Sequence, residues 1–189
     1  MNKEMEMRSL EINPTINDDN EIEGTAVVFN QRSDDLGGFD EIIEPTALDG
    51  VDISDVVLLY NHQSGNVLAR SSANTLSIFT DEQGVHFRAK LPNTTLGNDV
   101  KENLKNGNVR GMSFGFTIAE REWEKRGDNF TQHVKRIGRL LELSLTPFPA
   151  YESTDVQMSA RSLCDLKSSD KETLLEKEWF AIQKEFGGI

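Results

Sequence analysis

The stretch Gly111-Met112-Ser113-Phe114-Gly115-Phe116 places a serine between two glycines and surrounds it with large apolar side chains. Glycine weakens a strand, so two glycines flanking one residue indicate tight backbone geometry or the close approach of another segment. Such a stretch can present the serine hydroxyl at the end of a cleft. Because that hydroxyl is a poor nucleophile until a base accepts its proton, the chain must also supply a histidine and a carboxylate.

Short segments that are β-branched or alternate between apolar and polar residues dominate the chain around this stretch, and they predict strands. We expect strands at 21–29, 39–43, 55–60, 67–70, 75–79, 84–90, 109–119 and 140–145. The clearest helix is expected from Thr95, which can cap its start, to Gly107 at its end. Because strands do not alternate regularly with helices, the sequence predicts a mainly β fold, a small and mostly antiparallel β-barrel with helices packed outside.

Length and composition exclude several classes of protein. The 189 residues fit one domain of ordinary size, and the formal net charge of -12 disfavours a nucleic-acid surface. We expect no membrane segment and no signal peptide, because Met1 to Arg8 alternates charge and methionine without an apolar run. Cys164 is the single cysteine, and the three histidines lack metal-ligand spacing, so neither a disulfide nor a metal or cofactor is expected.

The composition changes near the C-terminus. We expect a β-barrel domain over residues 1–161, followed at 162–189 by a polar linker and an amphipathic helix or tail. Leu174, Leu175, Trp179, Ile182 and Phe186 would form the apolar face of that helix.

His62 is a better candidate for the base than His133. It follows the apolar strand that ends at Tyr60, where a side chain leaves the core and can face a cleft, and an imidazole there can accept a serine proton. A lone histidine at a strand end is also commonly an ordinary turn residue. His133 lies in a charged hairpin arm, and His86 lies inside a strand where a structural role is expected.

Glu142 is the candidate for the acid. It lies between Leu141 and Leu143 in an apolar strand, and a buried carboxylate there requires a partner such as a histidine that becomes charged. The alternation of the strand equally allows Glu142 to point away from the core. Ser144 would share its face and could hydrogen-bond in its place.

The glycine–x–serine–x–glycine string also suggests the nucleophile elbow of the α/β-hydrolases. That elbow needs a strand before the serine and a helix after it. Here a helix is expected upstream, and the residues that follow Ser113 continue as a strand, so the context is reversed.

Several segments together resemble the prohead maturation protease family of tailed bacteriophages and prophages. The segments are Leu58-Leu59-Tyr60-Asn61-His62, Val67-Leu68-Ala69-Arg70, Leu91-Pro92-Asn93-Thr94, Asn106-Gly107-Asn108-Val109, Gly111-Met112-Ser113-Phe114-Gly115-Phe116, Leu141-Glu142-Leu143-Ser144-Leu145-Thr146 and Pro149-Ala150-Tyr151. The likeness covers roughly residues 8–161. The Asn-His pair and the serine stretch, separated by a helix, are its most specific part.

The resemblance implies a serine endopeptidase with a barrel similar to that of herpesvirus assemblin. Ser113 then matches the nucleophile and His62 the general base. Glu142 would be the orienting acid, although the related viral enzymes use a second histidine there. The implied substrates are the phage major capsid protein, the scaffold and the chain itself, inside the procapsid in the host bacterial cytoplasm. A homo-oligomer is compatible with this reading.

Two other classes stay open. The negative charge and the C-terminal segment would also suit a non-enzymatic, scaffold-like component of the procapsid. A serine hydrolase of small esters would follow from the elbow string, and it predicts a helix directly after Ser113.

Overall fold

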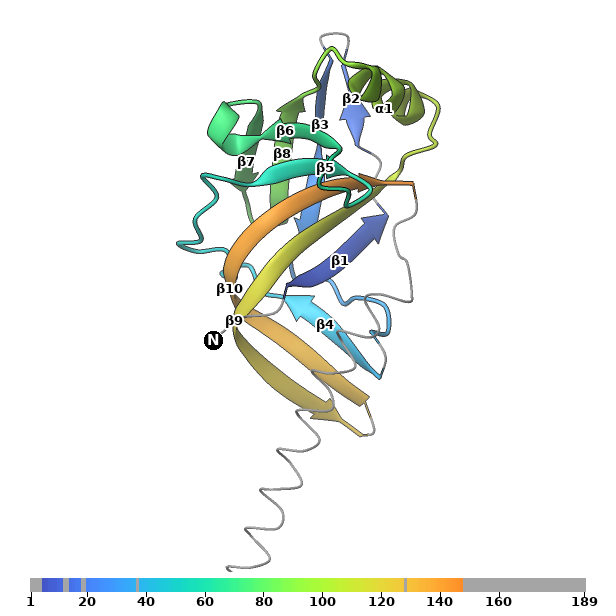
Figure 1. The fold of residues 1–189 in the computed structure, drawn as a ribbon. Helices are drawn as coiled ribbons and strands as arrows, with labels where there is room; N and C mark the ends of the chain where they lie inside the picture. Colours follow the sequence, from blue (N-terminus) through green and yellow to red (C-terminus); the bar gives the residue numbers. More distant parts are fainter. Residues whose placement is uncertain (1–4, 12–13, 18–19, 37, 128, 148–189) are drawn as a thin grey trace, which may run out of the picture.

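The computed structural model describes residues 5–11, 14–17, 20–36, 38–127 and 129–147, and these residues form two sheets and one α-helix (Figure 1). The mainly β fold expected from the sequence is confirmed. The elements are β1 (Glu6–Glu11), β2 (Thr15–Ile16), β3 (Glu21–Val28), β4 (Phe39–Ile43), β5 (Val57–Tyr60), β6 (Val67–Arg70), a 3₁₀ turn (Ser71–Ala73), β7 (Leu76–Thr80), β8 (Gly84–Lys90), α1 (Thr95–Lys105), β9 (Gly111–Arg126) and β10 (Asn129–Thr146).

The larger sheet has the strand order β1-β9-β10-β5-β6. The central element of this sheet is the long hairpin of β9 and β10, which curves through the molecule in Figure 1. β10 also pairs in parallel with β4 along its first part and with β5 along its last part. Register shifts between Val134 and Glu142 separate these two parts, and such bulges bend a strand and increase its twist.

The smaller sheet has the order β2-β3-β8-β7, and all of its pairings are antiparallel. The two sheets are not hydrogen-bonded into one closed ring within the described residues, so the predicted barrel is wrong there. The edge strands, β1 and β6 in the larger sheet and β2 and β7 in the smaller one, do not pair with one another in the described structure, and the sheets meet through side chains. The expectation of a mostly antiparallel arrangement holds, because among the described strands the pairings of β10 with β4 and β5 are the only parallel ones.

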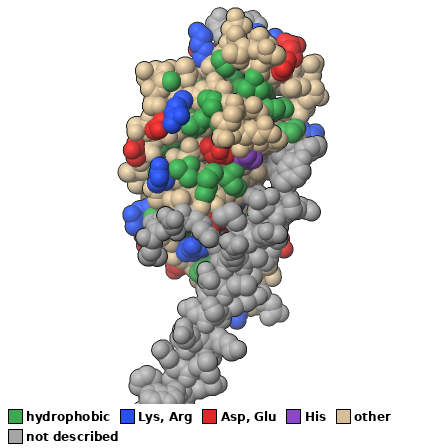
Figure 2. All heavy atoms as spheres, viewed as in Figure 1, with side chains coloured by type: hydrophobic (Ala, Val, Ile, Leu, Met, Phe, Trp, Pro, Cys, Tyr) green, Lys and Arg blue, Asp and Glu red, His purple; other side chains and the backbone are tan. Residues whose placement is uncertain are grey.

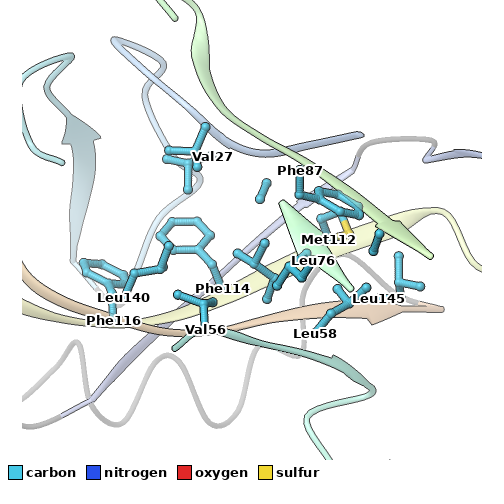
Figure 3. Packing of buried hydrophobic residues seen from close by; sticks show 14 of the residues in the cluster. Val27, Val56, Leu58, Leu76, Phe87, Met112, Phe114, Phe116, Leu140 and Leu145 are labelled. Atoms are coloured by element: carbon cyan, nitrogen blue, oxygen red, sulfur yellow. The ribbon is translucent and has the colours of Figure 1, made fainter. Parts of the chain in front are cut away.

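The hydrophobic core lies between the two sheets. Figure 3 shows Val27 and Phe87 of the smaller sheet above Met112, Phe114 and the end of β10. The apolar residues of β9 alternate along the strand, which gives it one face toward this core. The opposite face of β9 is therefore left for Ser113 and Gly115.

The helix α1 connects β8 to β9. Its N-cap is Thr94, whose side chain accepts a hydrogen bond from the backbone N–H of Gly97, and not Thr95 as the sequence suggested. Gly107 follows the helix with a φ of 69°, as expected for a glycine that ends one. No helix in the described part of the chain is long and apolar enough to cross a membrane.

The predicted boundary at residue 161 and the predicted C-terminal helix lie outside the described residues.

Candidate active site

Ser113 lies on β9, between β1 and β10. Its neighbours Met112 and Phe114 point into the core, so the serine side chain points to the other face of the sheet. Ser113 is nevertheless fully buried.

β10 places Glu142 on that same face. Across the hairpin, Ser113 pairs with Ser144 and Gly115 pairs with Glu142, while Leu143 is in the core. Glu142 thus points away from the core, which is one of the two alternatives left open by the sequence. This orientation makes it a diagonal neighbour of Ser113, and diagonal pairs are within reach of long side chains at about 7–8 Å between Cα atoms.

The turn after β5 carries His62. Tyr60 is the register partner of Leu145 on β10, and the backbone N–H of Asn61 donates to the carbonyl of Leu145 at 2.9 Å. Asn61 and His62 both have left-handed backbones, with φ of 54° and 57°. Two consecutive left-handed residues form a type I′ turn, and a non-glycine residue held in this conformation is strained. The turn therefore fixes His62 beside the end of β10.

His62 and Glu142 are joined by a short hydrogen bond. The distance from Nδ1 of the imidazole to Oε1 of the carboxylate is 2.5 Å. The His62 side chain is 33% exposed and that of Glu142 is 13% exposed, so the pair lies at the edge of the buried region. A carboxylate that accepts from Nδ1 selects the tautomer whose Nε2 can accept a proton.

The Ser113 hydroxyl makes its hydrogen bond elsewhere. It donates to the backbone carbonyl of Arg8 on β1 at 2.8 Å, and no hydrogen bond joins it to His62 in the described structure. The structure therefore brings the predicted base and acid together on the face of the predicted nucleophile, with the hydroxyl turned to another acceptor.

Arg8 is the neighbour of the site that the sequence did not reveal. Its guanidinium forms two hydrogen bonds with Glu41 of β4, at 2.8 and 2.9 Å, and one with Glu6 at 3.1 Å. Gln132 of β10 donates to Glu41 at 2.6 Å, and all four residues are buried. Burial alone would lower the pKa of the Arg8 guanidinium, but the two carboxylates outweigh it and raise that pKa. This buried network ties β1 to β4 and to the centre of the larger sheet.

The other two histidines lie elsewhere. His133, near the start of β10, contacts Glu44 through Nδ1 at 2.9 Å, and His86 contacts Thr25 at 3.1 Å in the smaller sheet.

No group of three or more potential metal ligands occurs among the described residues. The helix that an elbow needs after Ser113 is absent, because β9 continues as a strand to Arg126.

A serine, a histidine and a carboxylate are the side-chain types that serine hydrolases combine. The family model of the Caudovirus prohead serine protease matches residues 3–169. The chain belongs to this family.

The prohead protease of Enterobacteria phage HK97 is 30% identical over 143 residues, which cover 71% of this chain and 57% of that relative. The chain thus matches little more than half the length of this relative. The solved structure of the bacteriophage T4 capsid assembly protease, gp21, is also similar, with 10% identity and a TM-score of 0.48. The likeness covers 75% of this chain and 98% of that one.

Proposed function

We propose that the chain is a serine endopeptidase of phage procapsid maturation, with Ser113 as nucleophile, His62 as general base and Glu142 as the acid that orients the base. The observation that carries this proposal is the 2.5 Å bond between His62 Nδ1 and Glu142 on the face of Ser113. The order of the strands supports it too, because β9, β10 and β5 are neighbours in one sheet: β9 carries Ser113, β10 carries Glu142, and the turn after β5 carries His62.

The chemistry follows from this geometry. Ser113 turns from the Arg8 carbonyl toward Nε2 of His62, which takes the hydroxyl proton as Oγ bonds to the scissile carbonyl carbon. The imidazolium, stabilised by Glu142, then gives that proton to the leaving amine as the peptide bond breaks. Water, deprotonated by the same imidazole, attacks the acyl-enzyme and releases the second product and the free serine.

The substrates proposed are the major capsid protein, the scaffold and the chain itself. Support comes from the family, which is named for the prohead, and from the name of the HK97 relative. The reaction would then take place inside the assembling procapsid, in the cytoplasm of the bacterial host. On the face shown in Figure 2, basic side chains are scattered among acidic, apolar and polar ones, and the formal net charge is -12, which suits a protein substrate better than nucleic acid.

The test compares three chains, each co-expressed with the capsid protein and its scaffold. The native chain should process the capsid protein, Ser113→Ala should not, and Ser77→Ala should retain processing. Ser77 is the control because it is also a strand serine but lies on β7 in the smaller sheet, away from the site. A fluorophosphonate probe should label the native chain and Ser77→Ala only. Unchanged processing by Ser113→Ala would end the assignment, and absence of labelling in all three would favour a scaffold-like component.

A further inference from the structure

Gly115 stands directly opposite Glu142 in the β9–β10 hairpin. Its φ is not in the left-handed region, so the backbone conformation at this position does not require a glycine. The space around it does. A Cβ atom at Gly115 would lie 2.8 Å from Cγ of Glu142, 2.3 Å from Cε of Met5 and 3.0 Å from Sδ of Met7.

These three contacts differ in how easily they can yield. The methionine atoms are the far ends of flexible, unbranched side chains, which can move aside. Cγ of Glu142 is only two bonds from the backbone and moves only if the side chain changes its χ1 rotamer. Such a change carries the carboxylate away from its place. The turn and the bond from Asn61 to Leu145 hold the backbone at His62, so the imidazole follows only by rotating its own side chain.

We propose that Gly115 is a positioning residue for the acid of the site. The missing side chain leaves space on β9, the strand of Ser113, for Cγ of Glu142, while the carboxylate of Glu142 binds His62. The second glycine of the serine stretch thus acts through Glu142 on the imidazole, and it touches no reacting atom. The inference rests on the proposed function for its effect on turnover, but not for its effect on the bond between His62 and Glu142.

The first experiment follows that bond in the full chain by proton NMR. A hydrogen bond as short as this one should give a low-field Nδ1 proton signal, assigned by its loss in His62→Ala. We expect Gly115→Ala to lose the signal or shift it strongly upfield. Gly24→Ala is the matched control, because it also adds a methyl group to a strand glycine, 3.1 Å from Phe87, and should leave the signal in place. An unchanged signal in Gly115→Ala would overturn the inference.

The second experiment measures stability, so that a poorly folded variant still gives an answer. The melting temperature lost through Gly115→Ala should be smaller in a Glu142→Ala background, because alanine lacks the Cγ atom that a new methyl group would meet. An equal loss in both backgrounds would show that the glycine does not act through Glu142.

The third readout is turnover. A carboxylate moved by about an ångström can cost about 100-fold in rate, so Gly115→Ala should lower kcat about that far, with little change in KM and with a shifted acid limb of the pH profile. A native pH profile in this variant would contradict the inference. Failure of the proposed function is a different result, in which the native chain itself does not turn over while the NMR signal and the stability cycle behave as described.

Discussion

The side chain of Ser113 is bound to the backbone of Arg8, through a 2.8 Å hydrogen bond from Oγ to the carbonyl oxygen. The bond joins the first described strand to the strand of the predicted nucleophile, although the two residues lie far apart in the chain. It joins β1 to the proposed site, and in the proposed mechanism the hydroxyl has to rotate before His62 accepts its proton. What fixes β1 therefore matters for the site as well as for the fold.

The first prediction concerns the buried network that holds β1. Arg8→Met keeps much of the side-chain volume but leaves the carboxylates of Glu41 and Glu6 without their cation. A buried charge that has lost its partner costs about 3–5 kcal/mol, so the free energy of unfolding in urea should fall by about that much.

The control for this prediction is the double variant Arg8→Met/Glu41→Met. Replacing both partners by apolar side chains removes the unpaired charge of Glu41. The double variant should therefore be more stable than Arg8→Met alone, and a double variant that loses the sum of the two single effects would contradict the assigned pairing.

The second prediction concerns the charge of Glu142. Glu142→Gln keeps the shape of the side chain but no longer selects the tautomer of His62, and the equivalent change in a serine protease triad lowers kcat about 10⁴-fold. Steady-state kinetics on a capsid-derived peptide should show a loss of that order, with KM little changed.

Glu44→Gln is the matched control for Glu142→Gln. Glu44 also binds a histidine, His133, at 2.9 Å, but in the arm of the hairpin. Native turnover in Glu44→Gln together with native turnover in Glu142→Gln would show that neither pair serves the reaction.

How much of this site the sequence predicts depends on how local each signal is. The alternation around Glu142 and the position of His62 after an apolar strand are local patterns, and the structure joins these two residues. The strand β1 was not predicted, and the alternation of charge with methionine from Met1 to Arg8 does not reveal that the charged Glu6 and Arg8 are the buried residues. Its place is set by pairing with β9 and by the Arg8–Glu41 ion pair, and these contacts span much of the chain.

The fold shows the same difference between local patterns, which the sequence predicts, and contacts between distant segments, which it does not. The strands at Phe39–Ile43, Val67–Arg70 and Gly84–Lys90 have the bounds that their composition predicts. Closure of the barrel was predicted wrongly, because local patterns do not reveal which strands remain at the edges of their sheets, as β6 and β7 do in the described structure. Sheet topology depends on which edges meet, and that choice is made between distant segments.

The third prediction concerns the strained turn before the imidazole. Asn61 has a φ of 54°, a conformation that glycine adopts without cost and that a β-branched residue avoids. Asn61→Gly should keep turnover and stability close to native. Asn61→Val should lose about 1–2 kcal/mol of stability and most of its turnover, because the turn that places His62 is altered.

Asn74→Val is the control that shows whether the effect of Asn61→Val comes from backbone strain alone or from the place of the turn beside His62. Asn74 has a φ of 57° after the 3₁₀ turn, in a different loop. This variant should lose a similar amount of stability but keep its turnover per folded molecule, as measured by active-site titration. Equal loss of turnover in both valine variants would mean that the turn at Asn61 has no special role.

The fourth prediction concerns the pH dependence of stability in the β9–β10 arm. The hydrogen bond from His133, and the nearby Lys135, hold the pKa of the Glu44 carboxyl below its usual value of 4.5, against a smaller opposing effect of burial. Lys135 also contacts Glu122, and Glu124 lies near His133 at 3.4 Å.

A carboxyl whose pKa is lower in the folded state stabilises that state above its unfolded pKa, and the contribution is lost as the pH falls through the folded pKa. In urea unfolding, the native chain should therefore have a higher free energy of unfolding than Glu44→Gln at about pH 6, and this difference should shrink toward about pH 3.

The control is Glu120→Gln, which breaks an exposed contact with Arg136 and should differ little from the native chain in free energy of unfolding at either pH. A difference between native chain and Glu44→Gln that stays constant over this range would show that the ionised carboxylate does not stabilise the arm.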